Sequence, residues 1–297
     1  MDVDIGLLRS FAAVAEEGNL TRAAERLYVS QPAITKQIRR LEGLLGAPLF
    51  TRSRAGMSLT GAGRALADRV PDLLTEWDRA VTQTSAAAAL EGRVLRVGYL
   101  ASAANEATPK IIAAFQKSRP GWRVDMQQGA WSDPTAGLGS GTVDVAILRL
   151  PFPDQESWRV EALLSEPRCV ILPDTHRLAD EQEIYLRELW DEPFVAAPEE
   201  TGSWRDYWLA TDERGGNRPR IGAVTRHPDD WLTAIASGSG IALAPESAAR
   251  FYPRPGLVFR PVPDIGPSHV GVVWNPAENT TPAVQDFVKA GLAFRQA

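Results

Sequence analysis

The side chains best suited to chemistry in the first part of this sequence are cations, and the chemistry they indicate is the binding of a polyanion. Between Gly18 and Arg54 there are seven basic residues and two acidic ones, a net charge of +5. The whole chain of 297 residues has a net charge of −5, so the remainder carries −10. A basic module on an acidic body favours a polyanionic partner for the module alone, although a solvated helix face has the same composition.

Polar and basic residues are concentrated at the start of one predicted helix. Serine at the N-cap accepts a hydrogen bond from the first turn, and proline fits a position that needs no intrahelical donor, so Ser30 and Pro32 predict where this helix begins. Glutamine can pair with adenine through two hydrogen bonds, and threonine or alanine can contact a thymine methyl group. Candidates for base contacts are Gln31, Pro32, Ala33 and Thr35, and candidates for phosphate contacts are Arg22, Ser30, Lys36, Arg39 and Arg40.

Three helices must position these side chains. Residues 4–17 have one apolar face and end at Gly18, which suits a left-handed C-cap. Residues 20–27 predict a second helix with Thr21 as its N-cap, and the turn 28–30 leads into the third. Two helices joined by such a turn form a helix-turn-helix, whose second helix enters the major groove with its N-terminal end first. An ordinary helical hairpin has the same spacing.

A basic hairpin and a long helix follow. Residues 51–59 predict two short strands around a glycine turn, a wing on which Arg52 and Arg54 could lie along a minor groove. Thr60 is expected to cap one helix that runs to about Ala89. Its apolar residues recur at steps of three and four, and a head of sixty residues offers them no core, so we expect pairing with the same helix of a second subunit. The residues of this stripe are Leu66, Val70, Leu73, Trp77 and Val81.

The remaining two hundred residues alternate between strands and helices, which implies a parallel sheet with helices on both faces. The first set has strands at 94–99, 122–128 and 143–148 and helices at 109–117 and 133–138. A second α/β set follows. The closing strand and helix, 269–274 and 282–294, are expected to return to the first set. Two lobes joined by crossovers would leave a cleft, and ligands bind at such switch points outside the strand ends.

The ends of the strands supply the candidate lining of this cleft. Ser102 lies where a helix N-terminus could help to hold an anion, and Arg149 could make a two-pronged contact with a carboxylate. Two tryptophans and two arginines suggest a small anionic, aromatic ligand. The alternative is that the arginines form salt bridges within the lobes and the tryptophans belong to the core. The candidates are Leu100, Ser102, Trp131, Ser132, Arg149, Pro198, Thr201, Gly202, Trp204, Thr225 and Arg226.

Several stretches of the chain resemble LysR-type transcriptional regulators. Specific matches lie at residues 11–27, 29–35, 38–42, 46–52 and 59–63. Looser matches follow in the right order, so the resemblance covers nearly the whole chain; they lie at 95–99, 139–147, 172–179 and 238–245. The resemblance implies an N-terminal all-α winged helix-turn-helix with a long linker helix, followed by a two-lobed α/β domain that is similar to a type II periplasmic solute-binding fold.

The resemblance also implies a division of labour along the chain. Residues 1–59 would bind DNA, 60–91 would form the linker and dimerisation helix, and 92–297 would bind the effector. Lobe I of that last domain would take about 93–162 and 267–297, and lobe II about 163–266. The function implied is a sequence-specific transcriptional regulator on double-stranded DNA with an inverted-repeat operator. It would act as a homodimer and homotetramer, respond to a small-molecule effector in the cleft, and have RNA polymerase as a further partner.

Two rival hypotheses remain: a small-molecule binding protein, or an enzyme that uses the cleft, with a head that only mediates assembly. No zinc, phosphate-loop or nucleophile-elbow motif occurs, so we expect no metal, no cofactor and no enzymatic activity. The single cysteine, Cys169, lies in an apolar strand and is expected to be inert. No stretch approaches 18 consecutive apolar residues and the N-terminus is unlike a secretory signal, so we expect no membrane partner and a cytoplasmic location.

Overall fold

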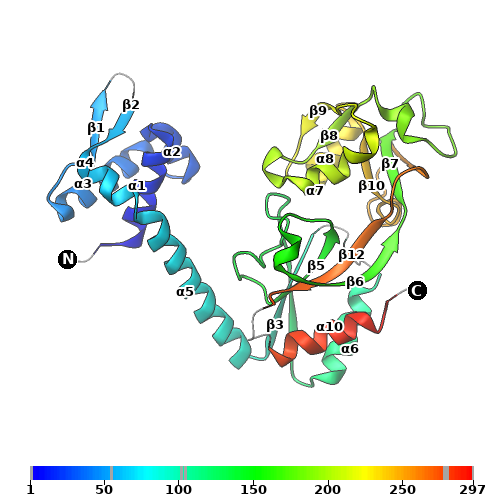
Figure 1. The fold of residues 1–297 in the computed structure, drawn as a ribbon, viewed down its shortest axis with the longest axis horizontal. Coiled ribbons are helices and arrows are strands. Elements are labelled where there is room, and N and C mark those ends of the chain that lie inside the picture. Colours follow the sequence, from blue (N-terminus) through cyan, green and yellow to red (C-terminus); the bar gives the residue numbers. More distant parts are fainter. Residues whose placement is uncertain (1–2, 54–55, 101–102, 104–105, 277–280, 296–297) are drawn as a thin grey trace. The chain divides into compact units, whose positions relative to one another are not determined.

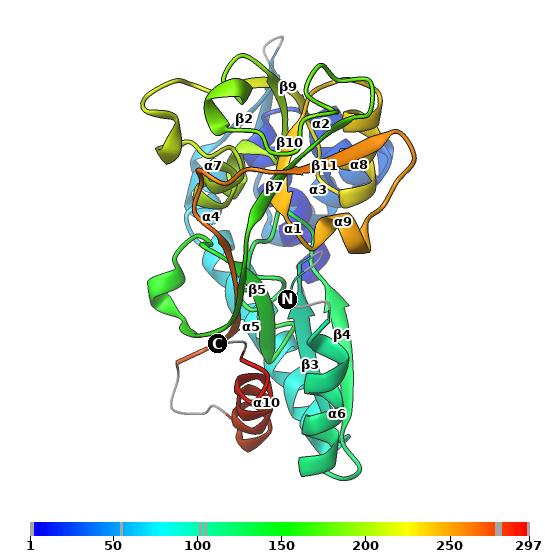
Figure 2. The ribbon, with the colours of Figure 1, turned by 90° about the vertical axis from the view of Figure 1, so that its right-hand side faces the viewer.

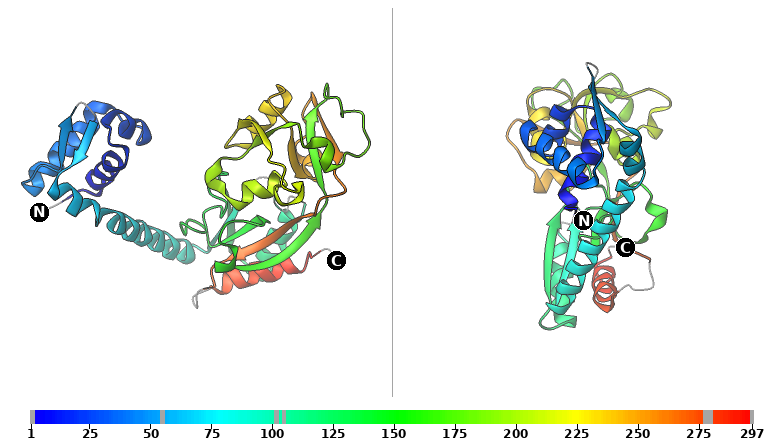
Figure 3. Two further views of the ribbon diagram at one scale, coloured as in Figure 1. Left: turned by 45° about the horizontal axis from the view of Figure 1, so that its top comes forward. Right: turned by 90° about the vertical axis from the view of Figure 1, so that its left-hand side faces the viewer.

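The computed structural model describes residues 3–53, 56–100, 103, 106–276 and 281–295. It divides into two compact units, Met1–Thr84 and Ser85–Ala297, and each is described here by itself (Figures 1 and 3).

Three predicted site residues fall outside this description. Arg54 and Ser102 lie outside the described residues, and of Arg52 only the backbone is described.

The first unit is a bundle of three helices with a short hairpin and a further helix. Asp4 caps the first helix by accepting from the backbone N–H of Gly6, and Gly18 ends it in the left-handed conformation. The second helix is capped by Asn19 and not by Thr21, because the Asn19 side chain accepts from the N–H groups of residues 21 and 22. The elements are α1 (Ile5–Glu17), α2 (Leu20–Arg26), α3 (Gln31–Leu45), β1 (Phe50–Ser53), β2 (Gly56–Leu59) and α4 (Gly61–Ala67).

One apolar core holds this unit together. Phe11 of α1 and Ile34 of α3 are fully buried, and the ring of Phe11 lies 5.3 Å from the ring of Phe50 at the start of the hairpin. The hairpin approaches the end of α1 so closely that a Cβ on Gly56 would stand 2.5 Å from the carbonyl oxygen of Gly18. Glycine at position 56 therefore allows β2 to dock against the helices.

The helix expected from Thr60 to Ala89 is two helices. Thr60 does cap the first, α4, but the chain turns at residues 68–69 and a new helix, α5 (Val70–Glu91), begins there. Pro71 explains the break, because proline has no N–H to donate and its ring clashes with the preceding turn.

The expectation that the head offers this stripe no core was wrong. Val70 is completely buried in the core of the first unit, and Leu66 packs against the same core. The assignment of Val70 to an intersubunit stripe is therefore corrected, since its side chain is already covered within its own subunit.

Lobe I is built on a five-stranded sheet with the order β4-β3-β5-β12-β6. β3 pairs in parallel with β4 and β5, so that Val97 lies between Met126 and Val145. β12 is antiparallel to both of its neighbours, which makes the sheet mixed and not purely parallel. The strands are β3 (Val94–Tyr99), β4 (Arg123–Gln128), β5 (Val145–Leu150), β6 (Arg159–Glu166) and β12 (Ser268–Trp274).

The two helices of lobe I cover the same face of this sheet. α6 (Thr108–Ser118) and α10 (Pro282–Leu292) pack against each other, and both lie in the lower part of Figure 2. Arg119 beside α6 donates to Asp286 of α10 at 2.8 Å. The closing strand and helix thus return to lobe I as predicted, but the expectation of helices on both faces was wrong.

Turns, and not the short helix expected at 133–138, cover the opposite face. Ala136 and Leu138 are buried against the strands there. Asp133 stabilises the turns by accepting from the backbone N–H groups of Thr135 and Gly137. At Gly98 a Cβ would stand 2.2 Å from the Ala136 carbonyl oxygen, so the turns lie directly on the sheet.

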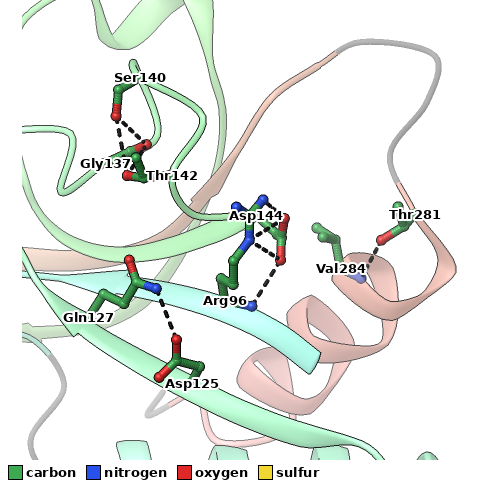
Figure 4. A network of polar contacts seen from close by, with 9 residues as sticks. All are labelled: Arg96, Asp125, Gln127, Gly137, Ser140, Thr142, Asp144, Thr281 and Val284. Carbon is green, nitrogen blue, oxygen red and sulfur yellow. Dashed lines mark hydrogen bonds and ion pairs between the residues drawn. The ribbon is translucent and has the colours of Figure 1, made fainter. Parts of the chain in front are cut away.

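An ion pair anchors the segment that leads into β5. The guanidinium of Arg96 donates to Asp144 at 2.6 Å, and the backbone N–H of Arg96 donates to the same carboxylate at 2.8 Å (Figure 4). Both side chains are largely buried. Figure 4 also shows Ser140 and Thr142 bonded around the Gly137 carbonyl, which closes the turn before β5.

Lobe II contains two sheets and short helices. β7 lies between β10 and β11, antiparallel to both, and β8 pairs in parallel with β9. β6 and β11 were not expected from the sequence, and β6 keeps the chain in lobe I as far as Glu166, past residue 162. The strands are β7 (Arg168–Pro173), β8 (Pro193–Ala196), β9 (Arg220–Val224), β10 (Ala242–Pro245) and β11 (Leu257–Pro261), and the α-helices are α7 (Ser203–Trp208), α8 (Pro228–Ala236) and α9 (Ala248–Phe251).

Candidate functional site

The first candidate site is the exposed face of α3. Ser30 caps the helix by accepting from the N–H of Ala33, as the sequence predicted. The side chains of Lys36, Arg39 and Arg40 are exposed, and no ion pair or hydrogen bond joins them to the described part of the chain. Their charges are available to an external anion, whereas Ile34 and Ile38 on the opposite face are buried.

Arg22 and Arg26 of α2, by contrast, are paired with carboxylates of the head. Arg22 pairs with Glu17, with a nitrogen–oxygen distance of 3.3 Å. Arg26 pairs with Glu16 and Glu17, and the hydrogen bond and charge of Glu16 raise its pKa above the ordinary value. Among the side chains described between Gly18 and Ser53, the basic ones without a partner are therefore those of α3.

The start of α3 is preorganised. Gln31 donates through its side-chain amide to the Thr35 hydroxyl at 3.0 Å, and that hydroxyl donates to the Gln31 carbonyl at 2.9 Å. Gln31 and Pro32 are exposed, while Ala33 and Thr35 are half-buried. This places one amide, one methyl-bearing hydroxyl side chain and two small apolar surfaces at one end of the helix.

Internal hydrogen bonds fix the orientation of α3 in the head. Ser10 of α1 donates to Gln37 at 2.7 Å. At the far end, Glu42 accepts from the backbone N–H groups of Leu49 and Phe50 at 2.8 and 3.3 Å, which ties the hairpin to the helix. These partly buried hydrogen bonds hold α3 against α1 and the hairpin, so its exposed residues are presented on a fixed support.

An apolar stripe lies on the surface of α5. Leu73 is 53% exposed, Trp77 48% and Val81 50%. Their spacing of four residues places them along one side of the helix. Large apolar side chains that share one exposed side mark an interaction surface more often than an inert one.

The second candidate site is a pocket at the junction of the two lobes of Ser85–Ala297, with about 770 Å³ of empty volume when the space open to solvent is included. Lobe I contributes one residue after β3, one after β4 and one within β5, and lobe II contributes most of the lining, chiefly from β8, α7, α8 and β10. Of the eleven predicted cleft residues, four line it: Leu100, Trp131, Arg149 and Trp204.

Much of the pocket lining was not predicted from the sequence. Trp208, Trp231, Tyr252 and Arg205 all border the pocket. The helical spacing of α7 was a usable signal for two of them. Residues 204, 205 and 208 lie on one side of that helix, and Trp204 was already predicted to line the cleft. Trp231 and Tyr252 come from elements that the strand-end rule does not cover.

The aromatic side chains of the pocket contact one another across the lobes. Trp131, from the turn after β4 of lobe I, lies 5.7 Å from the ring of Trp204 and 5.6 Å from the ring of Trp231, both in lobe II. Trp204 also contacts Trp208 at 6.4 Å. Trp131 and Trp204 are each only 7% exposed. These indoles therefore form an aromatic wall that joins the two lobes.

Arg149 is engaged within the protein. Its guanidinium pairs with Glu166 at 2.9 Å and donates to the hydroxyls of Ser268 and Ser247 at 3.0 and 3.3 Å. Burial lowers the pKa of Arg149, and the charge of Glu166 opposes that effect. Arg149 therefore forms a salt bridge within the protein, which was the alternative to a role in ligand binding. It lies where the strands cross between the lobes.

The remaining predicted cleft residues that the structure describes do not line the pocket. Thr201 is buried and donates to the Pro198 carbonyl at 2.7 Å. Arg226 is exposed and pairs with Glu200 at 3.2 Å. Ser132, Pro198, Gly202 and Thr225 also lie outside the lining. The predicted pair of ligand-binding arginines is therefore replaced by Arg149, already paired, and Arg205.

A redox or metal centre finds no support in the described chain. Burial raises the pKa of the Cys169 thiol to about 12, and its Sγ lies 3.5 Å from the Pro245 carbonyl oxygen. No group of three or more histidine, cysteine, aspartate or glutamate side chains among the described residues is placed to hold a metal ion. Within the same residues, no helix is long and apolar enough to cross a membrane.

A winged helix-turn-helix with a free basic recognition helix, in one chain with a two-lobed pocket, defines a DNA-binding regulator with a small-molecule-binding domain. Comparison with known proteins supports this class. Residues 5–64 match the bacterial regulatory helix-turn-helix protein family of LysR type, and residues 88–293 match the LysR substrate binding domain. The chain belongs to the LysR family of transcriptional regulators.

Individual relatives agree with this assignment. The chain is 31% identical to the Hca operon transcriptional activator HcaR of Escherichia coli, over 95% of this chain and 94% of the relative. It is 33% identical to the regulator TfdS of Cupriavidus pinatubonensis, over 82% of each. Among solved structures, full-length CbnR in complex with its target DNA is 26% identical, with a TM-score of 0.54, 99% of this chain covered and 100% of that chain.

Proposed function

We propose that this regulator binds an inverted-repeat operator as a dimer, with α3 of each subunit in the major groove. The observation that carries the proposal is the exposed, unpaired basic face of α3 beside an ordered Gln31–Thr35 pair. The similarity to CbnR, which was crystallised with its target DNA, supports duplex DNA as the partner.

The residues of α3 divide between bases and phosphates. Gln31 offers an amide that can pair with adenine, and Thr35 and Ala33 offer methyl groups to thymine. Lys36, Arg39 and Arg40 supply charge to the phosphates, with Ser30 at the helix start. We extend the phosphate role to Arg52 and Arg54 of the wing, whose removal would flatten the salt dependence of binding without changing the preferred sequence.

The dimer is proposed to form through α5. Leu73, Trp77 and Val81 are half-exposed on one side of the helix, and burial of a tryptophan between two copies would remove a large apolar surface from water. Two heads held by one interface match the symmetry of a palindromic site. Pairs of dimers would make the tetramer, and RNA polymerase would be a further partner at the promoter.

The pocket between the lobes is the proposed effector site. Besides the aromatic wall, one ion pair links the lobes at the surface: Glu106, which precedes α6, accepts from Arg250 of α9. Partial burial raises the pKa of Glu106, but the hydrogen bond and charge of Arg250 outweigh that effect and leave the pKa below its ordinary value. A ligand that changes the separation of the lobes would alter this ion pair and the aromatic contacts. The proposed result is a change in how the subunits pack, so that the pocket is coupled to DNA binding.

The function is proposed to be regulatory and not enzymatic, in the cytoplasm where the chromosome lies. The relatives are transcriptional regulators, and among the described residues of the pocket we find no pair of a nucleophile and a base. The rival hypothesis, a binding protein whose head only mediates assembly, predicts that the free charges of α3 are irrelevant to DNA.

Fluorescence anisotropy on the intergenic duplex beside the gene, against a scrambled duplex over a salt series, tests the proposal. We expect tighter binding to the native duplex and weakening with salt. The Gln31→Ala variant should lose preference at one base pair in each half-site, at a cost of about 1–3 kcal/mol. Equal binding of the two duplexes by the unmodified protein, with and without a metabolite mixture, would support the assembly hypothesis instead.

A further inference from the structure

Three indole N–H groups of the pocket are buried without an acceptor. The Nε1 atoms of Trp131, Trp204 and Trp208 have no hydrogen-bond partner in the described part of the chain, although all three residues line the pocket. Trp231 differs, because its Nε1 donates to the Val195 carbonyl at 3.3 Å. Buried donors are normally satisfied, so an unpaired set beside a cavity indicates a ligand that brings acceptors.

The charge around these donors is positive or balanced. The described lining contains no aspartate or glutamate. Arg149 is compensated by Glu166. Arg205 has a side chain that is only 12% exposed, and its partner Glu199 lies at 3.3 Å with a side chain that is 90% exposed. Water screens that carboxylate, so Arg205 is the cation of the pocket that is least neutralised.

The rest of the lining is apolar and rich in tryptophan. The ring of Trp131 is tilted by 54° from the ring of Trp204 and by 81° from the ring of Trp231. Offset or edge-to-face pairs of aromatic rings gain energy beyond the burial of their area, and a saturated ring of equal size lacks that gain. A cationic ligand, the other partner that aromatic walls accept, is disfavoured by Arg205.

From these observations, and resting on the proposed role of the cleft as the effector site, we propose that the pocket binds a small planar aromatic carboxylate. The ring packs against the Trp131–Trp231 wall. The carboxylate accepts hydrogen bonds from the indole N–H groups of Trp204 and Trp208 and faces the Arg205 guanidinium.

Titration of the full-length protein, followed by its tryptophan fluorescence, tests the ligand class. The probes are benzoate, benzamide, which keeps the ring but not the charge, and cyclohexanecarboxylate, which keeps the charge but not the flat ring. We expect saturable binding of benzoate, about tenfold tighter than either of the other two. Benzamide lacks the charge that strengthens the hydrogen bonds, and cyclohexanecarboxylate lacks the aromatic ring that pairs with the indoles. Equal affinity for benzamide would overturn the anionic part of the proposal, and equal affinity for cyclohexanecarboxylate the aromatic part.

Two pairs of variants assign the contacts. Trp204→Phe keeps a ring and removes one N–H, and should weaken benzoate about tenfold. Trp190→Phe is the matched control, because its Nε1 is also buried and unpaired but lies outside the pocket. Arg205→Gln should abolish the preference for benzoate over benzamide, whereas Arg226→Gln, an exposed paired arginine, should keep it.

The test separates this inference from the proposed function. If no aromatic carboxylate binds saturably while the protein still distinguishes its operator from scrambled DNA, the ligand class is wrong and the regulator stands. If benzoate binds with the expected selectivity while operator recognition fails, the ligand class stands and the DNA proposal fails. Equal weakening of benzoate by the Trp190 and Trp204 variants would also overturn the assignment, since it would show a loss of packing and not of a specific donor.

Discussion

The unpaired charge of Arg39 and the paired charge of Arg26 make a quantitative test of how this protein holds DNA. Replacement of either arginine by alanine lowers the net charge of the head by one. Arg39 has no partner among the described residues, so it can release a counterion from DNA, whereas Arg26 is already held by Glu16 and Glu17. The two variants therefore change the long-range electrostatic field of the head by the same charge. They differ only in whether a local contact with a phosphate is lost.

The magnitude follows from counterion release. Each phosphate contact contributes about 0.9 to the slope of log K against log salt, so loss of one contact costs about eightfold in affinity at about 0.1 M salt, or ~1.2 kcal/mol. We expect Arg39→Ala to reduce the slope by about 0.9 in anisotropy titrations, on the native and the scrambled duplex alike. Arg26→Ala should leave the slope unchanged.

Two results would refute the reasoning. An equal reduction of slope in both variants would mean that the ion pairs with Glu16 and Glu17 do not withhold Arg26 from DNA. An unchanged slope with altered base preference for Arg39→Ala would place Arg39 on a base edge and not on a phosphate.

Three further predictions concern the core, the interface and the thiol. Trp77→Glu should shift the protein from dimer towards monomer in sedimentation velocity, because a carboxylate replaces the largest apolar group of the α5 stripe; an unchanged dimer would place the interface elsewhere. Val70→Ala should instead lower the free energy of unfolding of the head by about 2 kcal/mol in chemical denaturation, with the dimer retained, since its side chain is buried in its own subunit. Cys169, with a thiol pKa of about 12, should resist a thiol reagent in the native protein at neutral pH and react once the chain is unfolded. The raised pKa contributes stability below the ordinary thiol pKa, and that contribution is lost as the pH rises towards 12; rapid labelling of the native protein would show that the strand opens.

The helix-turn-helix could be predicted from the sequence because the signals that begin and end its helices are local. Ser30 as a cap, Pro32 in the first turn and Gly18 at the end of α1 act within a few residues of their own backbone, and the structure has each in the expected role. Thr21 was misassigned because Asn19, two residues earlier, is an equally good cap, and its side chain accepts from the N–H groups of residues 21 and 22.

The sequence did not predict which residues of the apolar stripe belong to the core of the head and which are exposed. Leu66, Val70, Leu73, Trp77 and Val81 share one periodicity, and periodicity reports that a face is covered without saying by what. The break before Pro71 and the core around Phe11 assign the first two to the head and leave the others exposed.

Local capping, spacing and side-chain type were sufficient to predict the family, the order of the domains and the face of α3 that carries the basic side chains. The chemistry of the cleft depends instead on tertiary contacts. Trp131 and Trp231 are a hundred residues apart along the chain and 5.6 Å apart in space, and Arg149 meets Glu166 through the pairing of strands. Which cation stays free for a ligand depends on which carboxylate the fold brings beside each arginine, and that choice is made by contacts between segments distant in sequence.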